Sequence, residues 1–298
     1  MPLYANRVSD ILQRRSQDFL NIEAQTRLEL DALQQSLSQF QNLSVAEIEQ
    51  AIADVGHSGA LPTSEQDELS FIIPFEYQWQ HHQASRAWAA HKLRNVTTFA
   101  ADGSQITPAR EMSIQVGLVQ IGWFLNPHTL DSPYEKDVAV ELLTPQEFDR
   151  AVDKDSQREV EWRRFKGEVD AAINFFERYE GQDALAFFDG SFIVSFVGGM
   201  MPDRQQQYTE IVKHLLAKSA KTSVPIVGYV DNSYSSDLVT LMQHATGRTN
   251  IIRSSDAALL RSLMQWGDRS RVYRCDRGDE VLDKNYYRDV CVTYLKTT

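Results

Sequence analysis

The stretch TTFAADGSQI at residues 97–106 is repeated in outline by ALAFFDGSFI at residues 184–193. In each copy an apolar run of strand-forming residues leads into Asp-Gly-Ser, and apolar residues follow again. The apolar runs lack alternation, which predicts strands in the middle of a sheet with both faces covered. Ligands of such sheets gather outside the strand ends. The repeat therefore predicts that Asp102 and Asp189 lie at neighbouring strand ends and share one site.

Each Asp-Gly pair has a second interpretation, because Asp-Gly is also a favoured dipeptide in β-hairpin turns. One copy alone would favour the plain turn. The repetition, with apolar residues on both sides of each copy, favours a carboxylate site instead. Carboxylate oxygens at such a position suit a hard divalent cation.

The segments around the two copies predict a mixed sheet in an α/β domain. Helices are predicted after the intervening strands and between the later ones. The predicted strands cover 112–126, 136–143, 224–231 and 290–295, and the predicted helices cover 77–96, 157–179, 202–222 and 254–264.

The first part of the chain is predicted to be helical. Residues 4–55 contain no Gly or Pro, and apolar residues recur loosely at helical spacing. Ser44 and Glu47 fit a capping box that opens a further short helix. The turn-rich stretch GHSGALPTSEQDE at 56–68 is predicted to be a linker. The expected organisation is an N-terminal helical region at 1–70 and an α/β domain at 71–298.

Two roles remain open for the helical region: a cap on the domain, or an arm that binds a partner. Its apolar positions exceed what a solvated helix needs, which favours a homodimer.

The composition is that of a globular protein with an acidic balance, a formal charge of −11 over 298 residues. Acidity lowers the expectation of nucleic-acid binding, although a local positive groove can exist on an acidic body. No apolar run reaches the roughly 18 residues of a membrane span, and no signal peptide is recognisable. With only two Cys, no disulfide framework is expected. A cytoplasmic protein without a membrane partner is predicted.

A metal site for phosphodiester chemistry usually takes three or four carboxylates. Glu168 on the predicted helix 157–179 stands out, because Arg164 precedes it by four residues on the same helical face. Asp231, at the end of IVGYVD, is a fourth candidate. No HxxxH spacing is present, so zinc is not expected. No phosphate-binding GxxxxGK[ST] or GxGxxG motif and no GxSxG motif is present.

The order of these motifs resembles that of the NurA nuclease family: strand with DGS, long β-segment, Arg-xxx-Glu helix, strand with DGS, helix, and VPIVGYV. The run DAALLRSLMQWGDRSRVY at 256–273 is also similar to that family's sequence. The resemblance covers roughly residues 95–298. It implies a ribonuclease H-like core in which Asp102 and Asp189 match the strand-end metal ligands. Glu168 matches the family's helix glutamate.

The same resemblance implies a Mn²⁺-dependent (or Mg²⁺-dependent) DNA nuclease. Such a protein cuts single strands and resects duplex ends from 5′ to 3′ in double-strand break repair. It also implies a homodimer that binds a HerA-type hexameric translocase. Asp231 stands where the family often has Lys. A PYP-containing segment found in the family does not follow VCVTYLKTT, so the C-terminal part of the domain is expected to be incomplete.

The candidate DNA-binding residues are arginines: Arg164 beside Glu168, and Arg269 and Arg271 in the run GDRSRVYRCDRGD at 267–279. The alternative is a set of surface arginines balanced by neighbouring carboxylates. Two other functions stay open. One is a non-catalytic subunit of a translocase complex, and the other is a phosphotransferase of the actin-like superfamily, which would need a second nucleotide-binding lobe.

Overall fold

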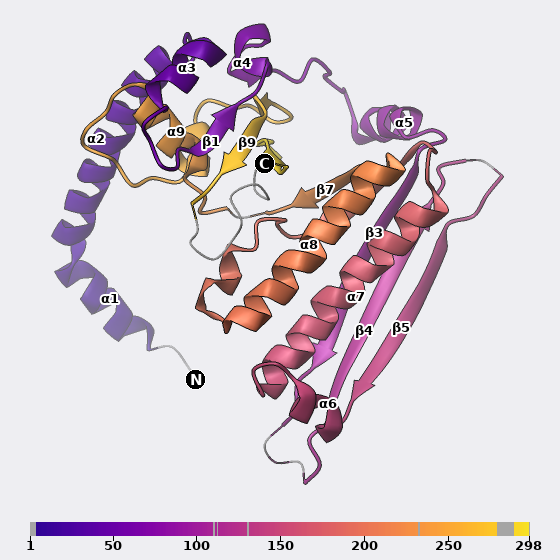
Figure 1. Ribbon diagram of the computed structural model, residues 1–298. Helices are drawn as coiled ribbons and strands as arrows, with labels where there is room; N and C mark the ends of the chain where they lie inside the picture. Colours follow the sequence, from indigo (N-terminus) through magenta and orange to yellow (C-terminus); the bar gives the residue numbers. More distant parts are fainter. Residues whose placement is uncertain are drawn as a thin grey trace. The chain divides into compact units, whose positions relative to one another are not determined.

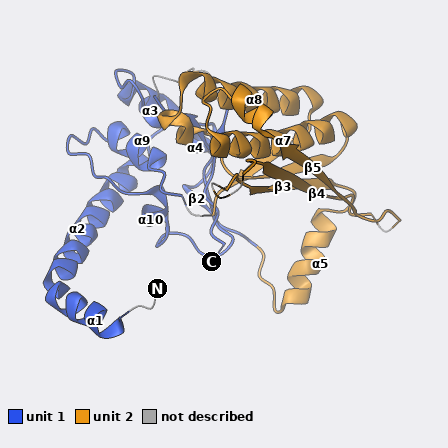
Figure 2. Ribbon diagram, turned by 90° about the horizontal axis from the view of Figure 1, so that it is seen from below, with its two compact units in different colours: residues 1–76, 233–278, 287–298 blue, residues 77–232, 279–286 orange. Residues whose placement is uncertain are grey.

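The computed structural model describes residues 4–109, 111, 113–129, 131–231, 233–278 and 289–297. By internal contacts the chain divides into two compact units (Figure 2). Unit 1 comprises residues 1–76, 233–278 and 287–298, and unit 2 comprises 77–232 and 279–286. Unit 2 is thus inserted into the sequence of unit 1. This division does not test whether residues 1–70 and 71–298 fold as separate domains, which stays a prediction.

Unit 1 joins the predicted N-terminal helices to the C-terminal part of the chain. Leu33, Leu37 and Phe40 pack in one core with Leu241 and Met242. Its helices and strands are α1 (Ala5–Arg14), α2 (Ser16–Phe40), α3 (Val45–Ala51), β1 (Gly59–Pro62), α4 (Glu65–Glu68), β2 (Ile72–Ile73), α9 (Asp237–Ala245), α10 (Asp256–Leu260), β8 (Arg269–Ser270), β9 (Tyr273–Asp276) and β10 (Cys291–Val292).

Two local predictions for unit 1 have different outcomes. The capping box at Ser44 and Glu47 is confirmed, since each side chain bonds the other's backbone N–H at the start of α3. The predicted linker at 56–68 is wrong. Its residues form β1, which pairs antiparallel with β9, and α4. Ala60 is 2% exposed, so long-range pairing overrides the turn-forming composition.

Unit 2 contains a five-stranded mixed sheet, and its strand order confirms the predicted fold class. The order is β5-β4-β3-β6-β7, in which β3, β4 and β5 are antiparallel neighbours and β6 and β7 run parallel to β3. This is the ribonuclease H-like topology. The elements are α5 (His82–Lys92), β3 (Thr97–Ile106), β4 (Gly117–Asn126), β5 (Glu135–Leu143), α6 (Pro145–Arg150), α7 (Ser156–Arg178), β6 (Ala184–Asp189), η1 (Ser195–Gly199), α8 (Pro202–Thr222) and β7 (Ile226–Tyr229).

One face of this sheet carries the long helices. Figures 1 and 2 show α7 and α8 side by side along the same face. The side chains beneath them are buried: Phe99 stacks on Phe175 of α7, with ring centroids 4.7 Å apart, and Ala186 is 0% exposed. Helix α7 begins where the side chain of Asp155 accepts bonds from the first-turn amides.

The opposite face of the sheet is exposed, which corrects the prediction that both faces of the two apolar strands are covered. Phe124 is 43% exposed and Phe187 is 42% exposed. In β3 the residues alternate between buried and exposed positions up to Asp102. The mainly apolar sequence hides this alternation, because apolar residues occupy exposed positions as well as buried ones.

The helical arm of unit 1 is packed only in its second half. Leu33, Leu37 and Phe40 are buried, whereas α1 has no buried residue. Ile11, Leu12, Phe19, Leu20, Ile22 and Leu28 are each more than half exposed. Among the described residues, none of the helices has both the length and the apolar character needed to cross a membrane.

Candidate active site

Asp102 and Asp189 lie side by side on the exposed face of the sheet. The parallel pairing of β3 with β6 matches Ala101 with Phe188, and each aspartate is the next residue of its strand. Neighbouring strands are about 4.7–4.9 Å apart, so the two carboxylates project next to each other. Both side chains are exposed. Asp189 ends β6 as predicted, but Asp102 lies within β3, which continues to Ile106.

Glu168 reaches this region from α7, on the other side of β3. A Cβ added to Gly103 would lie 2.5 Å from Oε1 of Glu168 and 2.5 Å from Cγ of Arg164. Only glycine at position 103 therefore lets the helix side chains come so close to the strand. Gly103, the glycine of the first Asp-Gly-Ser, is therefore needed for close packing against α7. A simple β-turn would not give it this role.

A second glycine fixes the height of α7 above the sheet. A Cβ on Gly167 would lie 2.7 Å from Cγ1 of the buried Ile121 in β4. Gly is unfavourable inside a helix by roughly 1 kcal/mol relative to Ala, so close packing explains its presence. Sequence reasoning missed Gly167, and the available signal was an isolated Gly in a helical pattern directly before the candidate Glu168.

The electrostatics of Glu168 connect it to both aspartates. The pKa of Glu168 is raised to about 7, chiefly by burial. Arg164 lowers it, and the negative charges of Asp102 and Asp189 contribute to raising it. Arg164 donates to Glu168 across 3.3 Å and is also 3.4 Å from the carbonyl of Gly103. Its Nε is buried without a hydrogen-bond partner in the described part of the chain. The carboxylate of Glu168 thus interacts electrostatically with both of the other predicted carboxylates.

These residues fit a hard divalent cation in their donor chemistry, because Mg²⁺ and Mn²⁺ favour carboxylate oxygens. A positive ion would also relieve the repulsion that raises the pKa of Glu168. Over residues 4–109, 111, 113–129, 131–231, 233–278 and 289–297, however, no three His, Cys, Asp or Glu side chains are already close enough to enclose an ion. Glu168 is paired with Arg164 instead of pointing between the aspartates. Binding an ion with all three would require its side chain to turn.

Asp231 follows β7, two residues beyond Tyr229, which is the register partner of Asp189. The Tyr229 hydroxyl donates to Asp231 across 3.3 Å. Asp231 is therefore near the sheet edge where β6 ends. It is not among the charges that chiefly shift the pKa of Glu168, so its predicted role as a fourth ligand stays a prediction.

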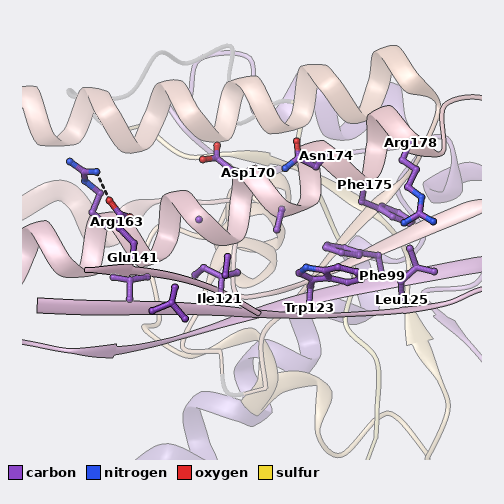
Figure 3. Close-up of a pocket in the computed structure, with 15 residues that line it drawn as sticks. Phe99, Ile121, Trp123, Leu125, Glu141, Arg163, Asp170, Asn174, Phe175 and Arg178 are labelled. Atoms are coloured by element: carbon purple, nitrogen blue, oxygen red, sulfur yellow. Dashed lines mark hydrogen bonds and ion pairs between the residues drawn. The ribbon is translucent and has the colours of Figure 1, made fainter. Parts of the chain in front are cut away.

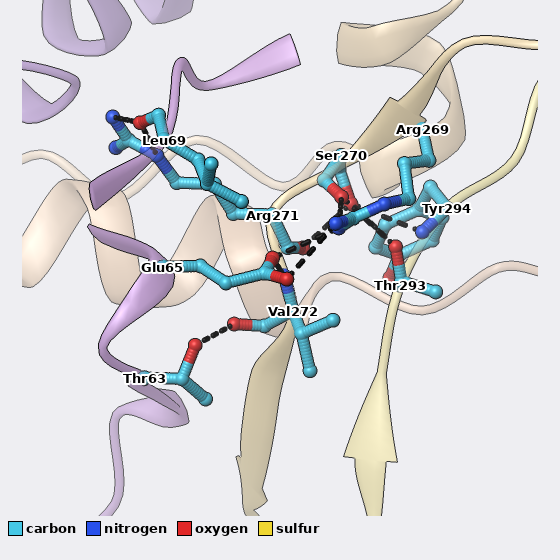
Figure 4. A network of polar contacts seen from close by, with 9 residues as sticks. All are labelled: Thr63, Glu65, Leu69, Arg269, Ser270, Arg271, Val272, Thr293 and Tyr294. Carbon is cyan, nitrogen blue, oxygen red and sulfur yellow. Dashed lines mark hydrogen bonds and ion pairs between the residues drawn. The ribbon is translucent and has the colours of Figure 1, made fainter. Parts of the chain in front are cut away.

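Arg269 and Arg271 both form contacts within unit 1 (Figure 4). Arg269 forms a two-pronged ion pair with Glu65, at 2.8 and 2.9 Å. Arg271 is 5% exposed and donates to the carbonyl of Leu69. Their guanidinium groups hold segments of unit 1 together, and their predicted role in DNA binding stays a prediction. Arg164 stays a candidate.

A hollow of unit 2 lies on the helix side of the sheet, between α7 and strands β4 and β5 (Figure 3). It has a volume of about 460 Å³ and is lined by apolar residues such as Phe99, Trp123 and Leu125. The ion pair of Arg163 with Glu141 borders it. None of the three candidate carboxylates lines this hollow, so it is separate from the acidic site.

Comparison with known proteins gives one match over most of the chain: residues 96–297 match the NurA domain family. No curated protein sequence matches the chain. A solved structure of NurA is 8% identical, with a TM-score of 0.26 and coverage of 68% of this chain and 50% of that one.

Two further solved structures are similar at the same low level. A NurA structure bound to dAMP and manganese is 8% identical, with a TM-score of 0.24 and coverage of 67% of this chain and 46% of that one. LC9-RNase H1 is 14% identical, with a TM-score of 0.24 and coverage of 58% of this chain and 86% of that one. The chain spans about half the length of the two NurA structures.

Proposed function

The chain belongs to the NurA family, a family of nucleases, and on that premise we propose that it is a divalent-metal-dependent DNA nuclease. The observation that best supports this proposal is that Asp102 and Asp189 directly follow the paired residues Ala101 and Phe188 of two neighbouring parallel strands. Both aspartates also contribute to the raised pKa of Glu168. Each of the three is a carboxylate that the sequence singled out.

In this proposal Asp102 and Asp189 hold the cation at the exposed face of β3 and β6. Glu168 turns from Arg164 to complete the ligand set, and Asp231 is a further candidate ligand. When bound, Mn²⁺ or Mg²⁺ would supply Lewis-acid stabilisation of charge at the phosphate. Arg164, released from Glu168, would be positioned to donate to a phosphate oxygen of the substrate.

Membership of the family also supports a more specific proposal for the reaction. We propose cleavage of single-stranded DNA and 5′-to-3′ degradation of DNA ends in double-strand break repair, with Mn²⁺ as the preferred ion. A relative's structure contains dAMP and manganese, which is consistent with such a substrate and ion. The direct test is to incubate end-labelled single-stranded DNA with the protein and Mn²⁺. Cleavage that EDTA stops supports the proposal, whereas intact DNA under all metal conditions contradicts it.

The second candidate is a non-catalytic subunit of a DNA translocase complex. The ion pair between Glu168 and Arg164 favours it, because this pair already engages one of the proposed ligands. Absence of cleavage together with retained binding to a HerA-type hexamer would support this candidate over the first.

We also propose that the protein is a homodimer joined through the arm. The apolar side chains on α1 and the first half of α2 are exposed, as a partner-binding surface requires. Light scattering should give twice the mass of the 298-residue chain. Phe19→Asp combined with Ile22→Asp should return the protein to a monomer, and a monomeric wild type would contradict the proposal.

The raised pKa of Glu168 gives a pH-dependent prediction for the metal-free protein. Because its pKa is about 7 in the folded protein and ordinarily 4.5, the folded state holds a proton that the unfolded state has lost between these values. Stability should therefore fall as the pH rises from about 4.5 to 7. Glu168→Gln, which cannot ionise, should make the protein more stable at pH 8 by on the order of 3 kcal/mol.

Denaturant unfolding in EDTA at pH 4 and pH 8 measures this difference. The variant and the wild type should be similar at pH 4, where the glutamate is protonated in both states. Asp256 also has a raised pKa, of about 6, but it is present in both proteins and cancels from the comparison. A difference between the proteins that is the same at both pH values would contradict a raised pKa of Glu168 in the folded protein.

A further inference from the structure

A row of exposed residues crosses the open face of the sheet directly beside the aspartate pair. Strand pairing places Ala100 opposite Phe124 on one side and opposite Phe187 on the other. Phe124 pairs in turn with Lys136, and Phe187 with Val227. The row from β5 to β7 is therefore Lys136, Phe124, Ala100, Phe187 and Val227.

The row is adjacent to the proposed cation site. Ala100 precedes Asp102 by two residues and Phe187 precedes Asp189 by two residues, so the row is roughly 7 Å from the carboxylates along the strands. This is about the length of one nucleotide in an extended strand. A phosphate held at the aspartates would thus bring a neighbouring base over the row.

The row has the surface that an unpaired base needs. Phe124 and Phe187 are separated by the small side chain of Ala100, with their strands roughly 10 Å apart. The ring of Phe124 stacks on that of Tyr134 at 5.0 Å, and Tyr134 is itself 56% exposed. The aromatic rings of Phe124, Phe187 and Tyr134 are thus exposed to solvent on either side of the small Ala100 side chain, and the helices do not cover them.

The charge at the end of the row distinguishes this surface from a purely apolar patch. Lys136 is exposed on β5, next to Phe124, and supplies a cation on a protein whose net charge is −11. A cation beside aromatic rings is the combination that binds single-stranded nucleic acids, where phosphates meet the charge and bases stack on the rings. In a duplex the base faces are already stacked on each other and are not offered to the protein.

We propose that Phe124 and Phe187, with Lys136, form a stacking subsite for an unpaired base next to the phosphate that is cleaved. This inference rests on the proposed nuclease function and names the residues that hold an unpaired base beside the acidic site. The subsite selects single-stranded DNA at the acidic site, without preference for base identity.

The test is a binding measurement that involves no cleavage. Fluorescence anisotropy in EDTA gives the Kd for a single-stranded oligonucleotide and for the same strand with abasic residues, which keeps the phosphates and removes the bases. The wild type should bind the normal strand about tenfold tighter or more. Phe124→Leu combined with Phe187→Leu should lose this preference while keeping the apolar surface. Lys136→Gln should weaken binding to both strands by a similar factor.

A matched control is Phe196→Leu, which removes an exposed ring that contacts Phe165 of α7 and Tyr208 of α8. This variant should keep the preference for the normal strand. A wild type that binds both strands equally, or binds neither, overturns the inference, and so does a double variant that keeps the preference. Failure of the nuclease proposal is recognised separately, as absence of metal-dependent cleavage.

Discussion

Asp102→Asn and Asp189→Asn are each expected to abolish Mn²⁺-dependent cleavage of single-stranded DNA, with a loss of at least about a hundredfold in rate. Substitution of residues that merely support metal ligands already costs about 10- to 100-fold, and these two carboxylates are the proposed ligands themselves. The amide keeps the size of the side chain but removes the charge that holds the ion. Gel assays with end-labelled DNA at saturating Mn²⁺ measure the rate.

The fold should survive both substitutions, because both side chains are exposed on the open face. The matched control is Asp137→Asn. Asp137 is an exposed carboxylate of the same sheet, but its pairing with Trp123 places it on the helix face. This control should cleave at the rate of the wild type. Full EDTA-sensitive activity in Asp102→Asn would remove Asp102 from the site.

Arg204→Met is expected to destabilise the protein by about 3–5 kcal/mol, the typical cost of removing one partner from a buried ion pair. Arg204 is 0% exposed in α8 and donates to Asp153 at 3.0 Å and to Glu159 of α7 at 2.7 Å. Its loss leaves the buried Asp153 without this counter-charge and leaves Glu159 paired with Arg163 alone. Burial alone would raise the pKa of Asp153, but its hydrogen bond with Arg204 brings that pKa below the usual value.

Urea unfolding at pH 7 measures this loss. Since the pKa of Asp153 is lowered in the folded protein, its stabilising contribution is present at neutral pH and disappears as the pH falls through the lowered value. The control is Lys166→Met, which breaks an exposed pair with Asp170 and should cost less than about 1 kcal/mol. Equal effects of the two substitutions would contradict the assignment of a buried ion network between α7 and α8.

The sequence predicted the elements that carry the site, because the signals there are local and repeated. The duplicated Asp-Gly-Ser marks two strands that are neighbours in the sheet, and the Arg-xxx-Glu spacing marks one face of α7. The fold class followed from the order of strands and helices. Neither inference needed knowledge of distant contacts.

Features that depend on partners far along the chain were not predicted. The pairing of β1 with β9 joins residues near 60 to residues near 275 and turns an apparent linker into a buried strand. The contacts of Arg269 with Glu65 and of Arg271 with the Leu69 carbonyl were also not predicted. The exposed face of the sheet was not predicted either. A strand made mainly of apolar residues has the same sequence pattern whether one of its faces is covered or both are.

Direct measurement of Mn²⁺ binding tests the central claim that Asp102, Asp189 and Glu168 form one cation site. Isothermal titration at pH 8, without DNA, compares the wild type with Asp102→Asn, Asp189→Asn, Glu168→Gln and the Asp137→Asn control. We expect each of the first three variants to lose at least about tenfold in affinity, while Asp137→Asn binds as the wild type does. Mn²⁺ affinity that is unchanged in both Asp102→Asn and Asp189→Asn would contradict it.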